Sequence, residues 1–196
     1  AILFLYREVL EAELPWLDGV ESAKAPRRLP VVLTRDEVGA LLARLPCTYG
    51  LICRLLYGTG MRLMEGLRLR VKDVDFACGE ILVRDGKGFK DRVTMLPASV
   101  VEDLRAHLER VRALHDRDLA AGHGEVWLPY ALDRKYPNAG REWGWQYVFP
   151  AAGLSKDPRS GRVGRHHVYE TSIQRAIKTA ARKAGRRRPM CAARPI

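Results

Sequence analysis

The sequence predicts an α+β fold that is mainly helical and contains one small antiparallel β-hairpin. Several segments repeat apolar residues every three or four positions, which is the period of an amphipathic helix. Residues 80–84 and 92–96 are short β-prone runs, and Asp85-Gly86-Lys87-Gly88 joins them with glycines that accept the positive φ of a tight turn. The 196 residues, 47% of them apolar, suffice for one domain with a full core.

Capping signals and apolar spacing place the helices in order along the chain. Residues 1–22 predict a helix with an apolar face, and residues 23–30 predict a basic linker that contains two prolines. Thr34 and Glu37 form a capping box that begins the next helix, and Pro46 stops it. Residues 123–165 are the least regular and most aromatic part of the chain. Further helices are expected over residues 49–57, 62–68, 98–120 and 171–184.

The chain is basic, and its positive charge is concentrated in one stretch. It carries 34 Lys and Arg against 23 Asp and Glu, a net charge of +11. Residues 156–188 contain eleven of these cations against Asp157 and Glu170. Such a block predicts a polyanionic partner, because each neutralised phosphate releases counterions. The alternative is a solvated basic surface without a partner.

Hydropathy and cysteine patterns exclude several other classes of protein. No stretch of about eighteen apolar residues is present, so the sequence predicts no membrane span. The four cysteines lie far apart without CxxC spacing, and we expect buried thiols in a reducing cytoplasm. The adjacent His166 and His167 lack a third ligand at metal-binding spacing. The sequence therefore predicts no metal site and no cofactor.

Two segments carry groups suited to phosphate chemistry. Residues 57–68 place a glycine turn before a predicted helix with Arg62 beside it, and open amides with a bidentate cation suit a phosphate. A structural helix-turn-helix gives the same pattern. Lys87 stands at the hairpin tip, with Lys90 and Arg92 on the returning strand, where a lysine can reach a phosphate and act as a general acid. A solvated surface lysine is the alternative.

Four aromatic residues at alternate positions form a third candidate: Trp143, Trp145, Tyr147 and Phe149. On a strand they line one face, whereas on a helix they are scattered around it. A hydrophobic core and a functional aromatic surface both fit this composition. The residue pattern leaves the choice between these roles open.

The spacing of Arg62 and Lys87 resembles that of the tyrosine recombinase family. The family's first motif reads Gly-Thr-Gly-x-Arg-x-x-Glu, and here Gly58-Thr59-Gly60-Met61-Arg62 is followed by Glu65. Lys87 follows Arg62 by 25 residues on the predicted turn. The resemblance implies a tyrosine-recombinase catalytic-domain-like fold over residues 31–189, with residues 1–22 as the remnant of a core-binding domain.

The resemblance implies transesterification on DNA without a metal or another cofactor. A tyrosine attacks the scissile phosphate, and cations stabilise the charge on its oxygens. Carried over residue by residue, Arg62 clamps a nonbridging oxygen, Lys87 protonates the leaving 5′ oxygen, and Glu65 orients the arginine. Full-length members are expected to assemble as tetramers on DNA in the bacterial cytoplasm.

A second part of the chain looks like an integron integrase. Residues 131–150, ALDRKYPNAGREWGWQYVFP, resemble the insertion that distinguishes this subgroup, which holds bases protruding from folded single-stranded recombination sites. Stacking a base on an aromatic ring contributes about 1 to 3 kcal/mol. The resemblance implies a base pocket from Trp145, Pro158, His166 and His167, and further DNA contacts from Lys90, Arg92, Arg162 and Arg165.

The last part of the sequence departs from the family. Members carry a His-x-x-Arg motif, a further His or Trp and the nucleophilic Tyr after the last helix predicted here, whereas residues 190–196 show no family pattern. We therefore expect a truncated catalytic domain that is inactive as it stands. Three origins are open: a frameshift, a partial clone and a natural truncation. The alternative functions are a noncatalytic DNA-binding decoy and a pseudogene product.

Overall fold

The computed structural model describes residues 5–11, 32–86, 88, 90–129, 132–157 and 161–184. The chain forms two compact units, Ala1–Val31 and Val32–Ile196. In the first unit the described residues include one π-helical turn, η1 (Leu5–Val9). Most of the helix predicted over 1–22, the linker over 23–30, Lys87, Pro158 and the tail over 190–196 lie outside the described residues. All elements below belong to the second unit.

Three helices lead from the start of the second unit to the first candidate site. The predicted capping box is present at α2 (Arg35–Leu42): the Thr34 amide donates to Glu37 Oε2 over 2.8 Å, and the Glu37 amide donates to Thr34 Oγ1 over 3.3 Å. Pro46 then separates α2 from α3 (Cys47–Thr59). Gly60 closes α3 in the left-handed region at φ 67°, which glycine adopts without strain, and α4 (Leu63–Leu67) follows.

A three-stranded antiparallel sheet follows these helices. Its strands are β1 (Val74–Asp75), β2 (Glu80–Val83) and β3 (Arg92–Met95), in the order β1-β2-β3. In the register of the predicted hairpin, Glu80 pairs with Met95 and Val83 with Arg92. The sequence did not predict β1, because two residues are too short for an alternating pattern.

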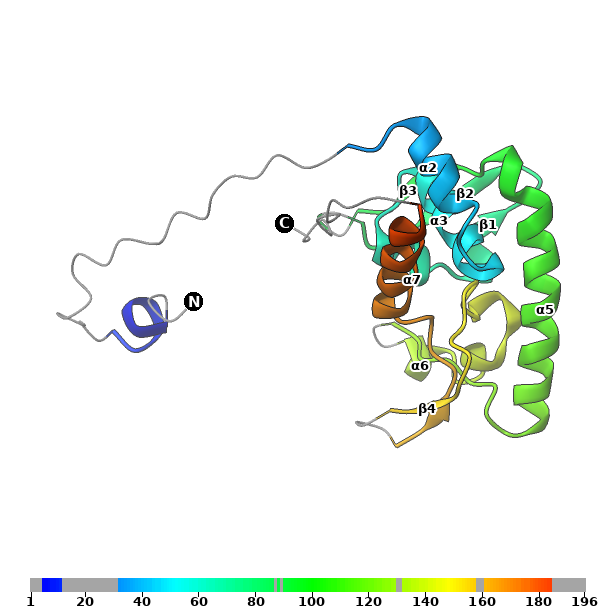
Figure 1. The fold of residues 1–196 in the computed structure, drawn as a ribbon. Helices are drawn as coiled ribbons and strands as arrows, with labels where there is room; N and C mark the ends of the chain where they lie inside the picture. The colour runs from blue at the N-terminus through cyan, green and yellow to red at the C-terminus, as the bar shows by residue number, and fades with distance from the viewer. Residues whose placement is uncertain are drawn as a thin grey trace. The chain divides into compact units, whose positions relative to one another are not determined.

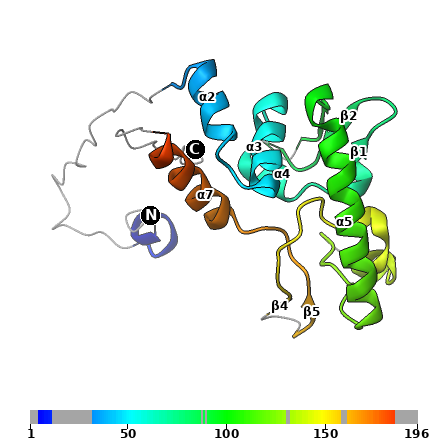
Figure 2. The same ribbon diagram turned by 45° about the vertical axis from the view of Figure 1, so that its right-hand side comes forward.

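The rest of the unit is one long helix, an irregular segment and a last helix. Figures 1 and 2 show α5 and α7 on opposite sides of this unit, with α2 beside α7. The irregular segment predicted over 123–165 contains only short elements. The bounds are η3 (Val71–Asp73), η4 (Ala98–Val100), α5 (Val101–Ala120), α6 (Leu132–Lys135), η5 (Ala139–Arg141), η6 (Trp143–Trp145), β4 (Ser155–Lys156), β5 (Val163–Gly164) and α7 (Glu170–Lys183).

The main core draws on α3, α4, α5, α7 and the first two strands of the sheet, which confirms the α+β prediction. Each fully buried Leu, Ile or Phe side chain stabilises the fold by about 1.5 to 3 kcal/mol. The site described below therefore stands on a packed scaffold. The largest fully buried side chains of this core are Phe149, Ile52, Leu55, Leu67, Ile81, Leu104 and Ile173.

The alternating aromatics form neither a strand nor one continuous helix. Trp143 and Trp145 lie in the short turn η6, Tyr147 makes an isolated bridge with Arg70, and Phe149 is fully buried. Two of them, Tyr147 and Phe149, are core residues at 3% and 0% exposure. The period of two thus belongs to an irregular chain in which the last two rings are buried and the first two are half-buried.

The expectation of buried thiols is wrong for two of the described cysteines. Cys53 is buried in α3, and its burial raises the thiol pKa to about 11. Cys47 and Cys78 are exposed, because they stand at a helix start and in the turn between β1 and β2. Helical or apolar context in the sequence did not distinguish the buried position from these two.

Candidate phosphate site and its basic surroundings

Arg62 stands between the glycine that ends α3 and the first residue of α4. Its backbone amide donates to Glu65 Oε2 over 2.9 Å, and its Nη1 donates to Glu65 Oε1 over 2.7 Å. Its side chain is 54% exposed, so the guanidinium remains accessible to an anion. The structure differs from the expected open amides here, since the Arg62 amide is already occupied and α4 has only five residues. Anion binding at this point depends on side chains.

Glu65 is a buried carboxylate held by two arginines. Its side chain is only 7% exposed, and Arg92 binds both of its oxygens, with Nη1 donating over 3.1 Å and Nη2 over 2.7 Å. The hydrogen bonds from Arg92 are the main reason that the Glu65 pKa falls to about 2, and Arg62 lowers it further. Burial alone acts in the opposite direction. The carboxylate is therefore ionised and paired throughout the neutral range.

The base of the hairpin lies against this ion pair. The Gly86 amide donates to Lys90 O over 3.1 Å, and the Asp85 amide donates to Asp91 Oδ1 over 3.0 Å, which closes the hairpin. A Cβ atom on Gly86 would lie 3.0 Å from Arg92 Nη1 and 3.7 Å from Glu65 Oε1. It would also lie 2.7 Å from the backbone oxygen of Lys90, and glycine avoids this clash. The residue before Lys87 is thereby fixed beside Glu65, although Lys87 itself is outside the described residues.

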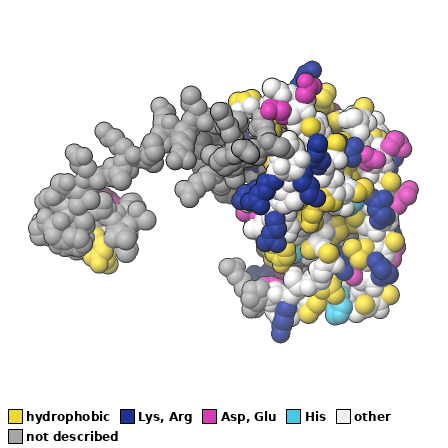
Figure 3. Space-filling view, in the orientation of Figure 1, with side chains coloured by type: hydrophobic (Ala, Val, Ile, Leu, Met, Phe, Trp, Pro, Cys, Tyr) yellow, Lys and Arg dark blue, Asp and Glu magenta, His cyan; other side chains and the backbone are white. Residues whose placement is uncertain are grey.

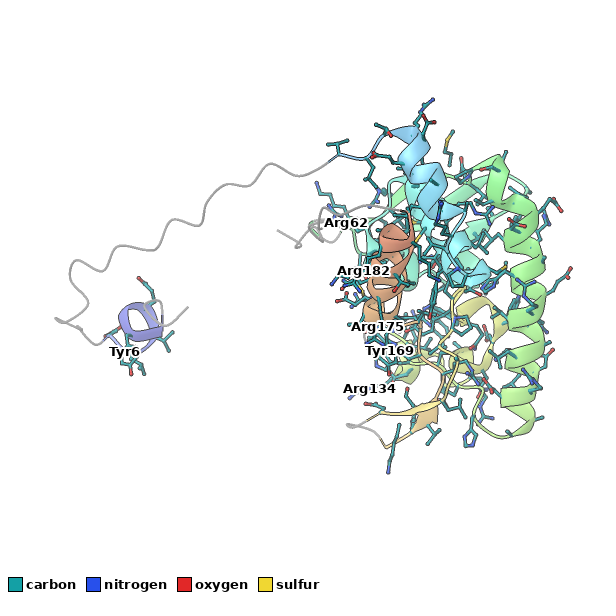
Figure 4. The ribbon with its side chains drawn as sticks, in the orientation of Figure 1. Tyr6, Arg62, Arg134, Tyr169, Arg175 and Arg182 are labelled. Carbon is teal, nitrogen blue, oxygen red and sulfur yellow. The ribbon has the colours of Figure 1, made fainter. Side chains whose placement is uncertain are left out.

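An open hollow of about 380 Å³ lies over these groups, lined by Gly60, Arg62, Lys90, Asp91 and Arg92. Three of the five lining residues are cations, and the Lys90 side chain is exposed. Because guanidinium and ammonium groups are the usual ligands of phosphate oxygens, the hollow is suited to a phosphate. Figure 4 labels Arg62 on the same side of the unit as α7.

Comparison with known proteins decides the family. The sequence profile described as Phage integrase family matches residues 32–192. This chain belongs to the phage integrase family. The matched range contains the whole Arg62–Glu65–Arg92 arrangement and the hairpin that bears Lys87.

Relatives agree with this assignment to the phage integrase family. Proteins named Integrase/recombinase from Escherichia coli and Pseudomonas aeruginosa are each 52% identical over 189 residues, which is 96% of this chain and 56% of each relative. The chain thus spans just over half the length of these curated relatives. Tyrosine recombinase XerA of Thermococcus kodakarensis is 48% identical over 95 residues, 47% of this chain and 34% of that protein.

Two solved structures show that the fold is that of phage integrase family members. The crystal structure of XerA recombinase superposes with a TM-score of 0.51 at 23% identity, covering 95% of this chain and 53% of that one. XerH site-specific recombinase bound to its difH substrate gives a TM-score of 0.54 at 20% identity, covering 97% and 48%.

The family's His-x-x-Arg motif is not supplied by the one such spacing in the sequence, His107 to Arg110. His107 is buried in α5, and its Nε2 lies 2.8 Å from Val148 O. Burial is the main cause that lowers its pKa. This histidine holds α5 to the segment 148–149, which is a structural role.

Arg70 organises the second candidate site, in the part of the chain that resembles the integron insertion. It is 7% exposed, and it donates to Trp145 O over 2.7 Å and to Trp127 O over 3.0 Å. Its guanidinium also stacks 3.7 Å from the centre of the Tyr147 ring. Lys72 Nζ lies 2.9 Å from the centre of the Trp145 ring. One face of Trp145 is therefore covered by a cation.

The two predicted histidines belong to this same cluster. The ring centroids of His166 and His167 are 4.0 Å apart, and they lie 5.4 Å and 5.3 Å from that of Tyr147. Burial is the main cause that lowers the pKa of both rings, and the positive charges of Arg68 and Arg70 lower it further. These effects favour the neutral form of both rings, which suits ring stacking.

The predicted DNA contacts Arg162 and Arg165 already have protein partners. Arg165 is 12% exposed and binds Asp118 through both oxygens, at 2.6 Å and 2.9 Å. Its Nη1 also donates to Ala151 O and Ala152 O. Arg162 binds Glu125 over 2.8 Å while 67% of its side chain is exposed. Contacts of these arginines to DNA stay predictions, and the geometry of Arg165 shows a role in joining α5 to the segment 151–165.

Sequence reasoning missed the exposed Trp127, and it counted the cations of α7 only as part of the basic stretch 156–188. Trp127 is 63% exposed, whereas the predicted Trp145 is half-buried. On α7, the residues exposed at spacings of three and four are Thr171, Arg175, Lys178 and Arg182. Lys and Arg side chains gather over α7 in Figure 3, and Figure 4 labels Arg175 and Arg182 there. The helical spacing of these cations was the signal in the sequence.

The described part of the chain contains neither a metal-ligand cluster nor a membrane-spanning helix. Within it, no three His, Cys, Asp or Glu side chains come close enough together to hold a metal ion. The described helices include none with the length and hydropathy needed to cross a bilayer.

Proposed function

We propose that this chain is the cation-bearing part of a site-specific DNA recombinase that works by phosphotyrosine transesterification. The observation that carries this proposal is the convergence of Arg62 and the base of the Lys87 hairpin on one open, cation-lined hollow. The related proteins named integrase and recombinase, and the fold shared with XerH bound to its difH substrate, support it.

The proposed chemistry assigns one task to each group. A tyrosine oxygen forms a bond to the scissile phosphorus while the bond to the 5′ oxygen breaks, and the leaving oxygen takes a proton from Lys87. Arg62 stabilises the negative charge on the nonbridging oxygens, which in comparable sites contributes about 3 to 4 kcal/mol. Glu65 is 2.7 Å from Arg62 and orients it. We propose that the complete enzyme assembles as a tetramer on DNA in the bacterial cytoplasm, and that these 196 residues alone bind DNA without cutting it.

A covalent-trapping experiment tests this proposal. The chain is joined to the C-terminal segment of the 52% identical Escherichia coli relative, and a nicked suicide substrate traps the protein–DNA adduct. We expect the fusion to form the adduct and the 196-residue chain to form none. Arg62→Ala and Lys87→Ala in the fusion should abolish the adduct and retain DNA binding. Variants that still form the adduct would overturn the assigned roles.

We further propose that the recombination sites are integron-like, folded single strands with extruded bases. The aromatic and histidine cluster around Arg70 supports this, because stacked rings and neutral histidines offer flat faces for unpaired bases. Trp127 offers a larger exposed surface than the half-buried Trp145 and His166.

Binding to a folded hairpin with extruded bases, compared with a fully paired duplex, tests the integron-like site. Trp145→Ala should weaken hairpin binding and leave duplex binding nearly unchanged, and Trp127→Ala should do the same if its exposed ring stacks on a base. The expected loss is about tenfold for each stacked base. Equal losses on both DNAs would show that these tryptophans do not bind extruded bases, and the proposed site would then be wrong.

A further inference from the structure

Arg92 was expected to contact DNA, yet its side chain points to a protein carboxylate. Both of its terminal nitrogens bind Glu65, in the paired geometry that arginine makes with carboxylates. The shared partner is 7% exposed, whereas Arg92 itself is 38% exposed. The pair links β3 to the first turn of α4, which are 27 residues apart in sequence.

The charge of Glu65 poses a problem for any phosphate in the hollow. An ionised carboxylate beside an anion site repels the anion, and its burial strengthens the repulsion because water screens it poorly. The Arg62 side chain reaches only one oxygen of Glu65, over 2.7 Å. Arg92 reaches both oxygens and is therefore the group that compensates this charge.

The same arginine also fixes the position of the hairpin. Its Nη1 would be 3.0 Å from a Cβ atom at Gly86, so the guanidinium supports the backbone at the residue before Lys87. Arg92 holds the Arg62 end of the site through their shared partner Glu65. At the hairpin end, its guanidinium lies directly beside Gly86. Arg92 thus binds the carboxylate that holds Arg62, and it lies beside the backbone of the residue before Lys87.

We propose that Arg92 is a positioning residue: it acts through Glu65 to orient Arg62, and it holds the base of the Lys87 hairpin against α4. The positioning role rests on the proposed function, whereas the ion pair between Arg92 and Glu65 is a feature of the structure itself. Arg92 affects a bound phosphate only through Glu65 and Arg62. Removal of Arg92 harms the site because Glu65 is left as an uncompensated charge that draws Arg62 away from the phosphate.

The first test follows the Glu65 carboxylate by carbon-detected NMR in the 196-residue chain. In the wild type its pKa is about 2, and in Arg92→Gln we expect it to rise toward the ordinary 4.5. Arg92→Lys should give an intermediate value, because one ammonium replaces a paired guanidinium. Arg84→Gln is the matched control, since Arg84 lies on the same hairpin and pairs with Asp73. An unchanged Glu65 titration in Arg92→Gln would overturn the inference.

The second test separates positioning from direct contact with DNA. We measure binding of a fluorescein-labelled 30-base-pair duplex by anisotropy at pH 7. If Arg92 acts through Glu65, Arg92→Gln weakens binding about tenfold, and adding Glu65→Gln restores most of it. If Arg92 contacts phosphate directly, the double variant stays as weak as Arg92→Gln, and the inference fails. Cooperative thermal unfolding of each variant shows that it is folded.

These outcomes distinguish this inference from the proposed function. A wild-type chain that does not bind the duplex contradicts the proposed function, while the Glu65 titration still decides whether Arg92 controls that carboxylate. A wild-type chain that binds, with no restoration in the double variant, contradicts the role of Arg92 alone.

Discussion

Glu65 combines a buried position with a carboxylate that is ionised at neutral pH, and this makes stability depend on pH. Its pKa is about 2 in the folded chain and about 4.5 when unperturbed, so the unfolded state takes up a proton first as the pH falls. The stabilisation, about 3 kcal/mol, is complete above pH 4.5 and is lost as the pH falls toward 2. About 2 kcal/mol of it should disappear between pH 6 and pH 3.

Urea unfolding at a series of pH values checks this expectation. The difference in unfolding free energy between wild type and Glu65→Gln should shrink by about 2 kcal/mol from pH 6 to pH 3. Glu80→Gln is the control, since Glu80 is an exposed carboxylate at the start of β2. A constant difference across this range would mean that the arginines do not hold the Glu65 pKa down.

Arg70 is a buried cation whose loss should cost stability as well as DNA binding. Arg70→Ala leaves the carbonyls of Trp127 and Trp145 without their donor and removes the stack on Tyr147. We expect a loss of about 3 kcal/mol in unfolding free energy, measured by urea titration. Arg68→Ala is the matched control, because Arg68 is exposed on the same segment and should change stability by less than about 0.5 kcal/mol. Similar losses in both variants would contradict this role.

Individual side chains were predictable only where partners are close in sequence. The contact between Arg62 and Glu65 was predictable, because the two residues are three positions apart at the start of a helix. The Arg92 partnership was not predictable, because nothing in a local pattern shows which carboxylate 27 residues away a strand residue will face. The Lys72 contact on Trp145 was hidden for the same reason.

At the scale of elements, two helical glycines offer a test of packing. A Cβ atom at Gly58 in α3 would lie 2.5 Å from Pro97 Cγ, whereas one at Gly39 in α2 meets nothing within 4 Å. Gly58→Ala should therefore destabilise the chain by about 1 to 3 kcal/mol through overpacking. Gly39→Ala should stabilise it by about 0.5 to 1 kcal/mol, since alanine loses less entropy in a helix.

Thermal unfolding of the two glycine variants measures both effects in one experiment. The melting temperature should fall for Gly58→Ala and rise for Gly39→Ala. A rise for both would show that Pro97 moves away at little cost, and the close contact between α3 and the start of η4 would not constrain the fold.

Most elements were predictable because their signals are local. The capping box at Thr34, the turn glycines of the hairpin and the apolar spacing of α5 each act within a few residues. The segment 123–165 was not predictable, since its short turns are stabilised by distant partners such as Arg70 and Asp118. The spacing of its aromatic residues therefore could not predict whether the segment forms a strand, a helix or short turns.

At the scale of the whole second unit, positive charge is distributed unevenly between two opposite helices. α7 exposes Arg175, Lys178 and Arg182 at helical spacing, and its first turn contains one acidic residue, Glu170. α5 also exposes arginines, but it carries five carboxylates among its 20 residues: Glu102, Asp103, Glu109, Asp116 and Asp118. The net charge thus favours α7 as the side that meets a polyanion.

The salt dependence of DNA binding tests this asymmetry directly. Arg175→Gln/Arg182→Gln on α7 and Arg110→Gln/Arg117→Gln on α5 remove the same charge from exposed positions on opposite sides of the unit. If α7 contacts phosphates, the slope of log K against log salt should fall by about 1.8 for the α7 pair, because each lost contact releases about 0.9 counterion fewer. The α5 pair should leave the slope nearly unchanged. Equal slopes for the two pairs would show that the whole basic surface attracts DNA without a defined binding side.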